Sequence, residues 1–102
     1  MQKVFVMYKL KPGVTMEQYK NWSRTLDQAV TPHQRSVKCF QVFEIKGAEK
    51  GTPPYQVIEV IDVAGWEAWQ KCLTEPGMKQ VVEEWESYGD GSTLVMLYGE
   101  EI

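Results

Sequence analysis

Hydrophobic and polar positions alternate along the chain with two different periods. Spacings of three and four run from Thr15 to near Pro32 and recur in residues 66–73 and 78–88. Such spacing places apolar side chains on one side of a helix. Alternation with a period of two, in segments rich in Val, Ile, Phe and Tyr, predicts β-strands. The predicted strands are residues 3–10, 37–46, 55–63 and 93–99.

Residues that favour turns and helix ends separate these segments. Pro12 and Gly13 form a turn after the first strand, and Thr15 with Gln18 three residues later predicts a capping box at the start of the first helix. Pro76 and Gly77 interrupt the second helical region. The order βαββαβ predicts one ferredoxin-like α+β domain over residues 1–102, an antiparallel sheet with both helices on one face.

Both faces of every predicted strand carry apolar side chains. We expect the compact aliphatic set to pack under the helices: Val4, Val6, Val42, Ile58 and Val60. The helix-free face would then carry the other set: Phe5, Met7, Phe43, Tyr55, Val57 and Ile61. Such a face exceeds the few hundred Å² of contiguous apolar surface that monomers usually expose.

A partner should therefore cover the helix-free face. We expect a second copy of the chain, related by a two-fold axis, which gives a homodimeric α+β barrel. A different partner protein, and a monomer with an exposed sheet, are the alternatives.

Composition narrows the class of protein. The chain has 102 residues, 43% of them hydrophobic and 25% charged, with a net charge of −3. This charge argues against nucleic acid and against an anionic membrane surface as partners. No segment approaches the roughly 18 apolar residues of a membrane span, and the N-terminus is no signal peptide. Cys39 and Cys72 are too few for a disulfide framework or a zinc site, which is typical of a cytoplasmic protein.

Glu59 is the first candidate for chemistry, because it lies within the apolar run YQVIEVID. Alternation places it opposite Ile58 and Val60, and hence on the helix-free face, inside the expected barrel. Desolvation there would raise its pKa toward the range useful for general acid/base catalysis. Alternatively, Glu59 is a structural carboxylate paired with Tyr55, Gln41 or a lysine of the partner copy.

His33 is the single histidine and a candidate proton shuttle from the connection after the first helix. It could equally be a solvated residue. Asp27 could accept a hydrogen bond from His33 or a backbone amide, or face solvent, while Trp22 is typical of a core position. Four further aromatic residues either line a pocket or pack: Tyr8, Tyr55, Trp85 and Tyr88. No spacing indicates a metal site or a nucleophilic triad.

Several segments along the chain resemble one known family. The matching positions are Leu10 to Val14, Tyr19, Trp22, Asp27, Ser36, Val37, Phe40, Pro54, Tyr55, Ile58 to Ile61, Pro76, Met78, Glu84, Trp85 and Tyr88. On these residues the chain resembles the RedY-like (HapK) family of prodigiosin-type pigment biosynthesis, within the dimeric α+β barrel superfamily. The resemblance implies a homodimer that acts on a small aromatic or pyrrolic intermediate without a metal or organic cofactor. The segment TPHQR and Val57 depart from the family pattern.

These observations predict a cofactor-independent enzyme of secondary metabolism. Glu59 would be the general acid/base for a condensation, dehydration or tautomerisation, with His33 or a tyrosine hydroxyl as the second proton partner. The aromatic substrate would occupy the cavity between sheet and helices. Its predicted binding residues are Tyr55, Phe5, Met7, Phe43, Gln41, Val57, Asp27, Trp22 and Tyr88. A non-catalytic carrier of a reactive intermediate and a cofactor-free monooxygenase are the alternatives.

Overall fold

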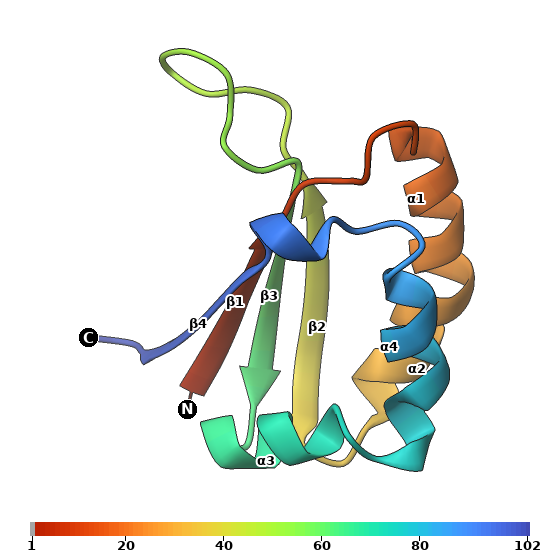
Figure 1. Cartoon of the computed structure of the whole chain (residues 1–102). Helices are drawn as coiled ribbons and strands as arrows, with labels where there is room; N and C mark the ends of the chain where they lie inside the picture. Colours follow the sequence, from red (N-terminus) through yellow and green to blue (C-terminus); the bar gives the residue numbers. More distant parts are fainter. Residues whose placement is uncertain (1) are drawn as a thin grey trace.

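One antiparallel sheet organises the fold. The computed structural model describes residues 2–102 and has four strands in the order β2-β3-β1-β4 (Figure 1). The strands are β1 (Gln2–Tyr8), β2 (Val37–Glu44), β3 (Val57–Val63) and β4 (Val95–Glu100). Helical segments cover one face of this sheet and leave the other bare. The predicted ferredoxin-like α+β fold is confirmed.

The first crossover is helical from Met16 to His33. It consists of α1 (Met16–Trp22), a π-helical turn (Ser23–Asp27), α2 (Gln28–Val30) and a 3-10 turn (Thr31–His33). The predicted capping box is confirmed: Gln18 N donates to Thr15 Oγ1 at 3.1 Å, and Thr15 N donates to Gln18 Oε1 at 3.0 Å. These bonds satisfy amides that the first turn would otherwise leave unpaired.

The π-helical turn explains which polar side chains of this crossover face the sheet. Tyr19, Ser23, Asp27 and Thr31 follow one another at intervals of four and are all buried. In an α-helix of about 3.6 residues per turn, positions four apart drift around the axis. The wider π turn, with its i→i+5 hydrogen bonds, counteracts this drift. Four polar positions therefore stay on the buried side of one helical segment.

The second crossover has the break that the sequence predicts. It runs through α3 (Trp66–Cys72), a 3-10 turn (Pro76–Met78) and α4 (Lys79–Trp85), and a further 3-10 turn (Gly91–Thr93) precedes β4. Figure 1 shows α3 at one end of the sheet and α4 on the same side as α1. None of the helices in the described part of the chain is long and apolar enough to span a membrane.

The register of β1 and β3 corrects the predicted sheet faces. Val6 pairs with Glu59 and Val4 pairs with Ile61. Directly paired residues point to the same face of a sheet. Since Val4 and Val6 are buried under the helices, Glu59 and Ile61 lie there too.

The face prediction was therefore right for β1 and reversed for β3. Val57, Glu59 and Ile61 lie under the helices, and Ile58 and Val60 lie on the bare face. Alternation divides a strand into two sets of side chains but does not say which set faces the helices. The prediction that Ile58 and Val60 pack under the helices was wrong. Glu59 lies on that side instead, where Tyr8 donates a hydrogen bond to its carboxyl group.

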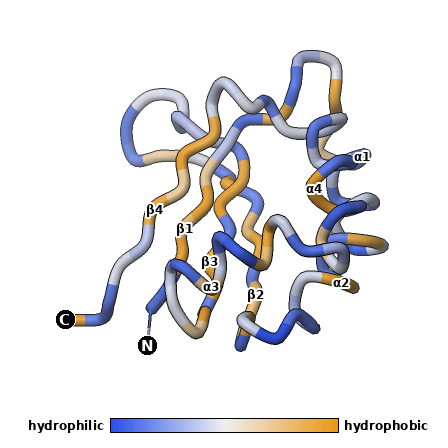
Figure 2. Tube along the Cα trace, turned by 60° about the horizontal axis from the view of Figure 1, so that its bottom comes forward, coloured by the Kyte–Doolittle hydropathy of each residue, from blue (hydrophilic) through white to orange (hydrophobic). Residues whose placement is uncertain are grey.

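The helix-free face of the sheet is apolar, as predicted, although its membership differs. The strands are among the most hydrophobic parts of the chain (Figure 2). Phe43 and Leu97 on this face are 45% and 53% exposed. The register assigns seven large apolar residues to it: Phe5, Met7, Phe43, Ile58, Val60, Val95 and Leu97. We call this set the bare sheet face.

Candidate active site

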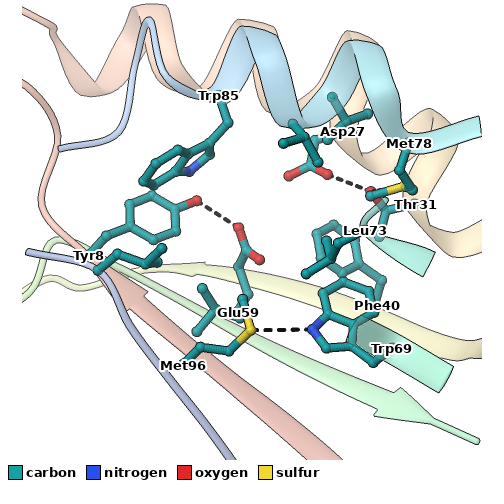
Figure 3. Close-up of a pocket in the computed structure, with 14 residues that line it drawn as sticks. Tyr8, Asp27, Thr31, Phe40, Glu59, Trp69, Leu73, Met78, Trp85 and Met96 are labelled. Atoms are coloured by element: carbon teal, nitrogen blue, oxygen red, sulfur yellow. Dashed lines mark hydrogen bonds between the residues drawn. The ribbon is translucent and has the colours of Figure 1, made fainter. Parts of the chain in front are cut away.

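A cavity of about 170 Å³ lies between the sheet and the helices (Figure 3). Its wall is mostly aromatic, aliphatic and sulfur-containing, with four side chains that carry polar oxygen atoms. The lining residues are Val6, Tyr8, Asp27, Thr31, Phe40, Glu59, Trp69, Leu73, Met78, Val81, Val82, Trp85, Leu94 and Met96. Cavities of this kind, apolar with a few convergent polar groups, are the usual form of a small-molecule site.

Glu59 rises from the middle of β3 into this cavity. Tyr8, from the adjacent strand β1, donates its hydroxyl to Glu59 Oε2 at 2.6 Å. The hydroxyl groups of Tyr8 and Tyr19 are 2.5 Å apart. Trp85 packs edge-on against the ring of Tyr8, with ring centroids 5.0 Å apart. Tyr19 and Trp85 therefore hold Tyr8 in place, and the Tyr8 hydroxyl orients Glu59 through Oε2. Glu59 Oε1 takes no part in these contacts.

Asp27 enters the same cavity from the helical side. The π-helical turn carries it, and Thr31 one turn later donates its hydroxyl to Asp27 Oδ1 at 2.6 Å. Figure 3 shows Asp27 and Glu59 on opposite walls, one on a helix and one on the sheet. The cavity thus lies between two carboxyl groups from different layers of the fold.

Burial shifts the acidity of both carboxyl groups in the same direction. Desolvation, and then the charge of Asp27, raise the pKa of Glu59 from 4.5 to about 8, against the opposing effect of the Tyr8 hydrogen bond. Desolvation raises the pKa of Asp27 from 3.8 to about 6, although the Thr31 hydroxyl lowers it in part. Because the two groups interact, their protons are lost in steps that belong to the pair.

Neither carboxyl group has a cationic partner in the cavity. The lining contains no Lys, Arg or His, and the ion pairs found in residues 2–102 join Lys3 to Asp62, Lys20 and Lys46 to Glu44, and Lys79 to Glu83. A buried carboxyl group without a counter-charge costs stability. Such perturbed pairs in a cleft are candidates for proton transfer.

The structure brings two of the predicted site residues to the cavity, Glu59 and Asp27. His33 is exposed at the end of its 3-10 turn and does not line the cavity, so the prediction that it approaches the site is not supported. The expected Asp27–His33 contact is replaced by the bond from Thr31.

The other predicted binding residues lie elsewhere. Phe5, Met7, Phe43 and Gln41 belong to strand positions on the opposite side of the sheet. Val57 is buried on the helix side but outside the cavity lining.

Three further aromatic residues predicted to bind substrate also lie outside the lining. Tyr55 precedes β3 and does not reach the cavity. Trp22 and Tyr88 stack on each other with centroids 5.1 Å apart, and Trp22 Nε1 donates to Glu84. Both are packing residues, as expected of a core tryptophan.

Several cavity residues lay outside the sequence prediction. Thr31, Trp69 and Met96 were not expected, and Tyr8 was considered only as one of several aromatic residues. One sequence pattern could have predicted Thr31 on the helical side of the cavity: polar side chains recur at intervals of four from Tyr19 to Thr31. The tyrosine bonded to Glu59 comes from another strand, and no local pattern indicates it.

Within residues 2–102, no group of three or more His, Cys, Asp or Glu side chains converges as a metal site would require. The cavity has two carboxyl groups, and each is already hydrogen-bonded to a hydroxyl group.

Comparison with known proteins places the chain in a family. The profile of the REDY-like protein HapK family matches residues 2–102. The chain belongs to this family. The family resemblance seen in the sequence is therefore confirmed. No match was found among proteins of curated function.

Solved structures share the fold. HapK from Hahella chejuensis is 19% identical with a TM-score of 0.81, covering 100% of this chain and 93% of that one. An EthD family protein from Bacillus halodurans is 17% identical with a TM-score of 0.78, covering 100% of this chain and 99% of that one. A protein from Thermobifida fusca, described as dimeric and ferredoxin-like, is 13% identical with a TM-score of 0.74, covering 98% and 90%.

Proposed function

We propose that this member of the HapK family is a cofactor-independent acid–base enzyme whose active site is the cavity between sheet and helices. The observation that carries the proposal is the pair of buried carboxyl groups, Glu59 and Asp27, facing one aromatic-walled cavity without a cation. A structural role alone would favour a salt bridge or an apolar side chain at these positions.

The two groups suit different proton roles. Glu59, whose pKa is raised to about 8, holds a proton at neutral pH and serves as general acid through Oε1, while Oε2 accepts from Tyr8. Asp27, whose pKa is raised to about 6, is the more readily ionised member and serves as the base. When two carboxyl groups of one site have different pKa values, the group with the higher pKa is usually assigned as the acid and the other as the base. Condensation, dehydration and tautomerisation all involve proton transfers to and from the substrate, which such a pair can carry out.

The cavity favours a small aromatic ligand that carries an N–H group. An engineered apolar cavity of about 150 Å³ in another protein binds benzene, so a cavity of about 170 Å³ accommodates one ring. The hydroxyl groups of Tyr8 and Thr31 already donate to the carboxyl groups. Since Glu59 holds its proton at neutral pH, the ionised Asp27 is the group that calls for a donor from the ligand, and the N–H of a pyrrole supplies one. This class agrees with a role in prodigiosin-like pigment biosynthesis.

The proposal is tested with 2-methylpyrrole as a probe in D₂O. A deuterated Glu59 carboxyl donates a deuteron to the unsubstituted ring carbon beside nitrogen, and a carboxylate then removes the proton from that carbon. The net change replaces C–H by C–D, and NMR follows the loss of the ring-proton signal. We expect catalysed exchange by the wild type and a loss of about 100-fold or more in Glu59→Gln.

Glu83→Gln provides the matched control. Glu83 is an exposed carboxylate on α4 whose ion pair with Lys79 spans 4.0 Å. It should exchange the probe at the wild-type rate. Exchange by Glu59→Gln within about threefold of wild type would contradict the assignment. Stoichiometric binding without exchange in the wild type would identify a carrier, and oxygen consumption with a substrate would identify a monooxygenase.

The quaternary structure belongs to the same proposal. Seven large apolar residues form the bare sheet face, and a second copy of the chain would cover them with an identical surface. The structurally similar protein from Thermobifida fusca is described as dimeric. These two observations support a homodimer through the bare sheet face.

A further inference from the structure

A second pocket lies behind the tyrosine pair. It has a volume of about 230 Å³ between the first helical segment and the edge strand β2. Its lining is Met16, Tyr19, Lys20, Ser23, Arg24, Gln28, Val42 and Glu44. Arg24 and Gln28 are exposed, so this pocket meets solvent. Tyr19 lines this pocket, whereas Tyr8 lines the active-site cavity.

Two short hydrogen bonds connect the pockets. Tyr8 donates to Glu59 Oε2 at 2.6 Å, and 2.5 Å separates the hydroxyl oxygens of Tyr8 and Tyr19. A phenol has a single proton to donate. Since Tyr8 uses its proton for Glu59, Tyr19 must be the donor to Tyr8. Both tyrosine hydroxyl groups therefore donate in the same direction, from the second pocket toward the active site.

We propose that Tyr19 and Tyr8 form a proton path that reprotonates Glu59 from solvent in the second pocket. This inference rests on the proposed function, in which Glu59 gives a proton to the substrate. As Glu59 loses the proton on Oε1, the proton of Tyr8 moves to Oε2, that of Tyr19 moves to Tyr8, and a proton from solvent moves to Tyr19. Each tyrosine ends with one proton, and the net transfer is one proton from solvent to Glu59.

The surroundings favour concerted transfer over ionised intermediates. Burial, the main cause, and the charge of Glu59 raise the pKa of Tyr8 and of Tyr19 far above the usual value, so neither phenol persists as an anion. Asp27, on the π-helical turn, is a further charged group close enough to raise the pKa of Tyr19. In the second pocket Lys20 is paired with Glu44, and Arg24 lies at the surface. The path therefore joins a polar, solvated entrance to an apolar cavity.

Hydroxyl exchange in the free protein tests the path directly. Tyrosine labelled with ¹³C at Cζ reports, in mixed H₂O and D₂O, how fast each hydroxyl group exchanges with solvent. In Tyr19→Phe the Tyr8–Glu59 bond is kept and the path is cut. We expect exchange of the Tyr8 hydroxyl to slow by about tenfold or more. An unchanged Tyr8 rate overturns the proposal.

Tyr88→Phe is the matched control, because Tyr88 is also an aromatic packing residue and lines neither pocket. It should leave the Tyr8 rate unchanged, and amide exchange in β1 should be the same in both variants. If Tyr19→Phe does not fold, 3-fluorotyrosine at position 19 keeps the hydroxyl and makes it more acidic. Exchange of Tyr8 should then become faster, and an unchanged or slower rate overturns the path.

The measurement separates this inference from the proposed function. The hydroxyl-exchange measurement uses no pyrrole probe. If the ring-exchange assay fails but Tyr19→Phe slows exchange of the Tyr8 hydroxyl, only the catalytic role is refuted. Ring exchange that depends on Glu59, together with an unchanged Tyr8 rate in Tyr19→Phe, would refute only the path.

Discussion

At the scale of single residues, Glu59 shows how a site departs from what stability alone favours. The residue is 7% exposed, and its carboxyl group accepts a hydrogen bond from Tyr8. Burying an ionised carboxylate with so little compensation is unfavourable, so the group keeps its proton to a higher pH instead. The same burial that costs stability thus keeps the Glu59 carboxyl group protonated at neutral pH.

This shift predicts a pH dependence of stability. The pKa of Glu59 is raised from 4.5 to about 8 in the folded state, so between these values the folded chain binds more protons than the unfolded chain. The free energy of unfolding should therefore fall as pH rises through this window and level off above it. Urea unfolding at about pH 5 and about pH 8 should show a larger loss for wild type than for Glu59→Gln.

Glu83→Gln is again the control and should keep the wild-type pH dependence. Asp27 titrates in all three proteins, with its pKa raised to about 6, so the difference between wild type and Glu59→Gln reports Glu59 together with its interaction with Asp27. An equal pH dependence in wild type and Glu59→Gln would mean that Glu59 titrates near its ordinary value.

At the scale of elements, the π-helical turn at Ser23–Asp27 decides the chemistry of the helical wall. It keeps polar positions spaced by four on the sheet side, which an α-helix would rotate away. Asp27 therefore meets the cavity, and Thr31 follows closely enough to donate to it. The secondary structure of this segment and the acidity of the site are thus coupled.

Removing the Thr31 hydroxyl tests this coupling. The hydrogen bond from Thr31 lowers the pKa of Asp27, so Thr31→Val, which keeps the shape, should raise that pKa above about 6. A hydrogen bond to a charged group is worth about 1.5–3 kcal/mol, which corresponds to a rise of roughly one to two pKa units. A ¹³C NMR titration of the aspartate carboxyl groups measures the shift.

Thr25→Val is the matched control for this substitution. Thr25 lies in the same π-helical turn, but its hydroxyl donates to the backbone oxygen of Asn21 at 2.8 Å. The pKa of Asp27 should be unaffected there. A fall of the Asp27 pKa in Thr31→Val would contradict the described contact.

At the scale of the whole molecule, the sheet has one covered and one uncovered apolar face. Leu97 and Phe43 are 53% and 45% exposed on the bare sheet face. Contiguous apolar surface of this kind marks an interaction site. The proposed active-site cavity lies on the other side of the sheet, so association through the bare sheet face would leave the cavity lining within one protomer.

Leu97→Glu should therefore convert the proposed dimer into a monomer, because pairing would bury a new carboxylate within an apolar interface. Sedimentation velocity should show the wild type as a dimer and Leu97→Glu as a monomer. Ala29→Glu adds the same charge at an exposed position of α2 and should stay dimeric. A monomeric wild type at tens of micromolar would contradict the proposal.

The sequence by itself determined the order of elements, the capping box at Thr15 and the break at Pro76. It also divided each strand into two sets of side chains, and it selected Glu59 as the candidate acid/base and Asp27 as a candidate binding residue. These are local properties, since they depend on residues within a few positions of one another in the chain. The family resemblance was visible at the same level.

Only the tertiary structure decided which side of β3 faces the helices and what surrounds Glu59. Tyr8 is 51 positions away from Glu59 in the chain, and the register between β1 and β3 brings the two side chains together. The structure likewise places His33 at an exposed position outside the cavity lining, and that position depends on how the crossover packs. Strand register and packing depend on contacts between distant segments, and no local pattern contains that information.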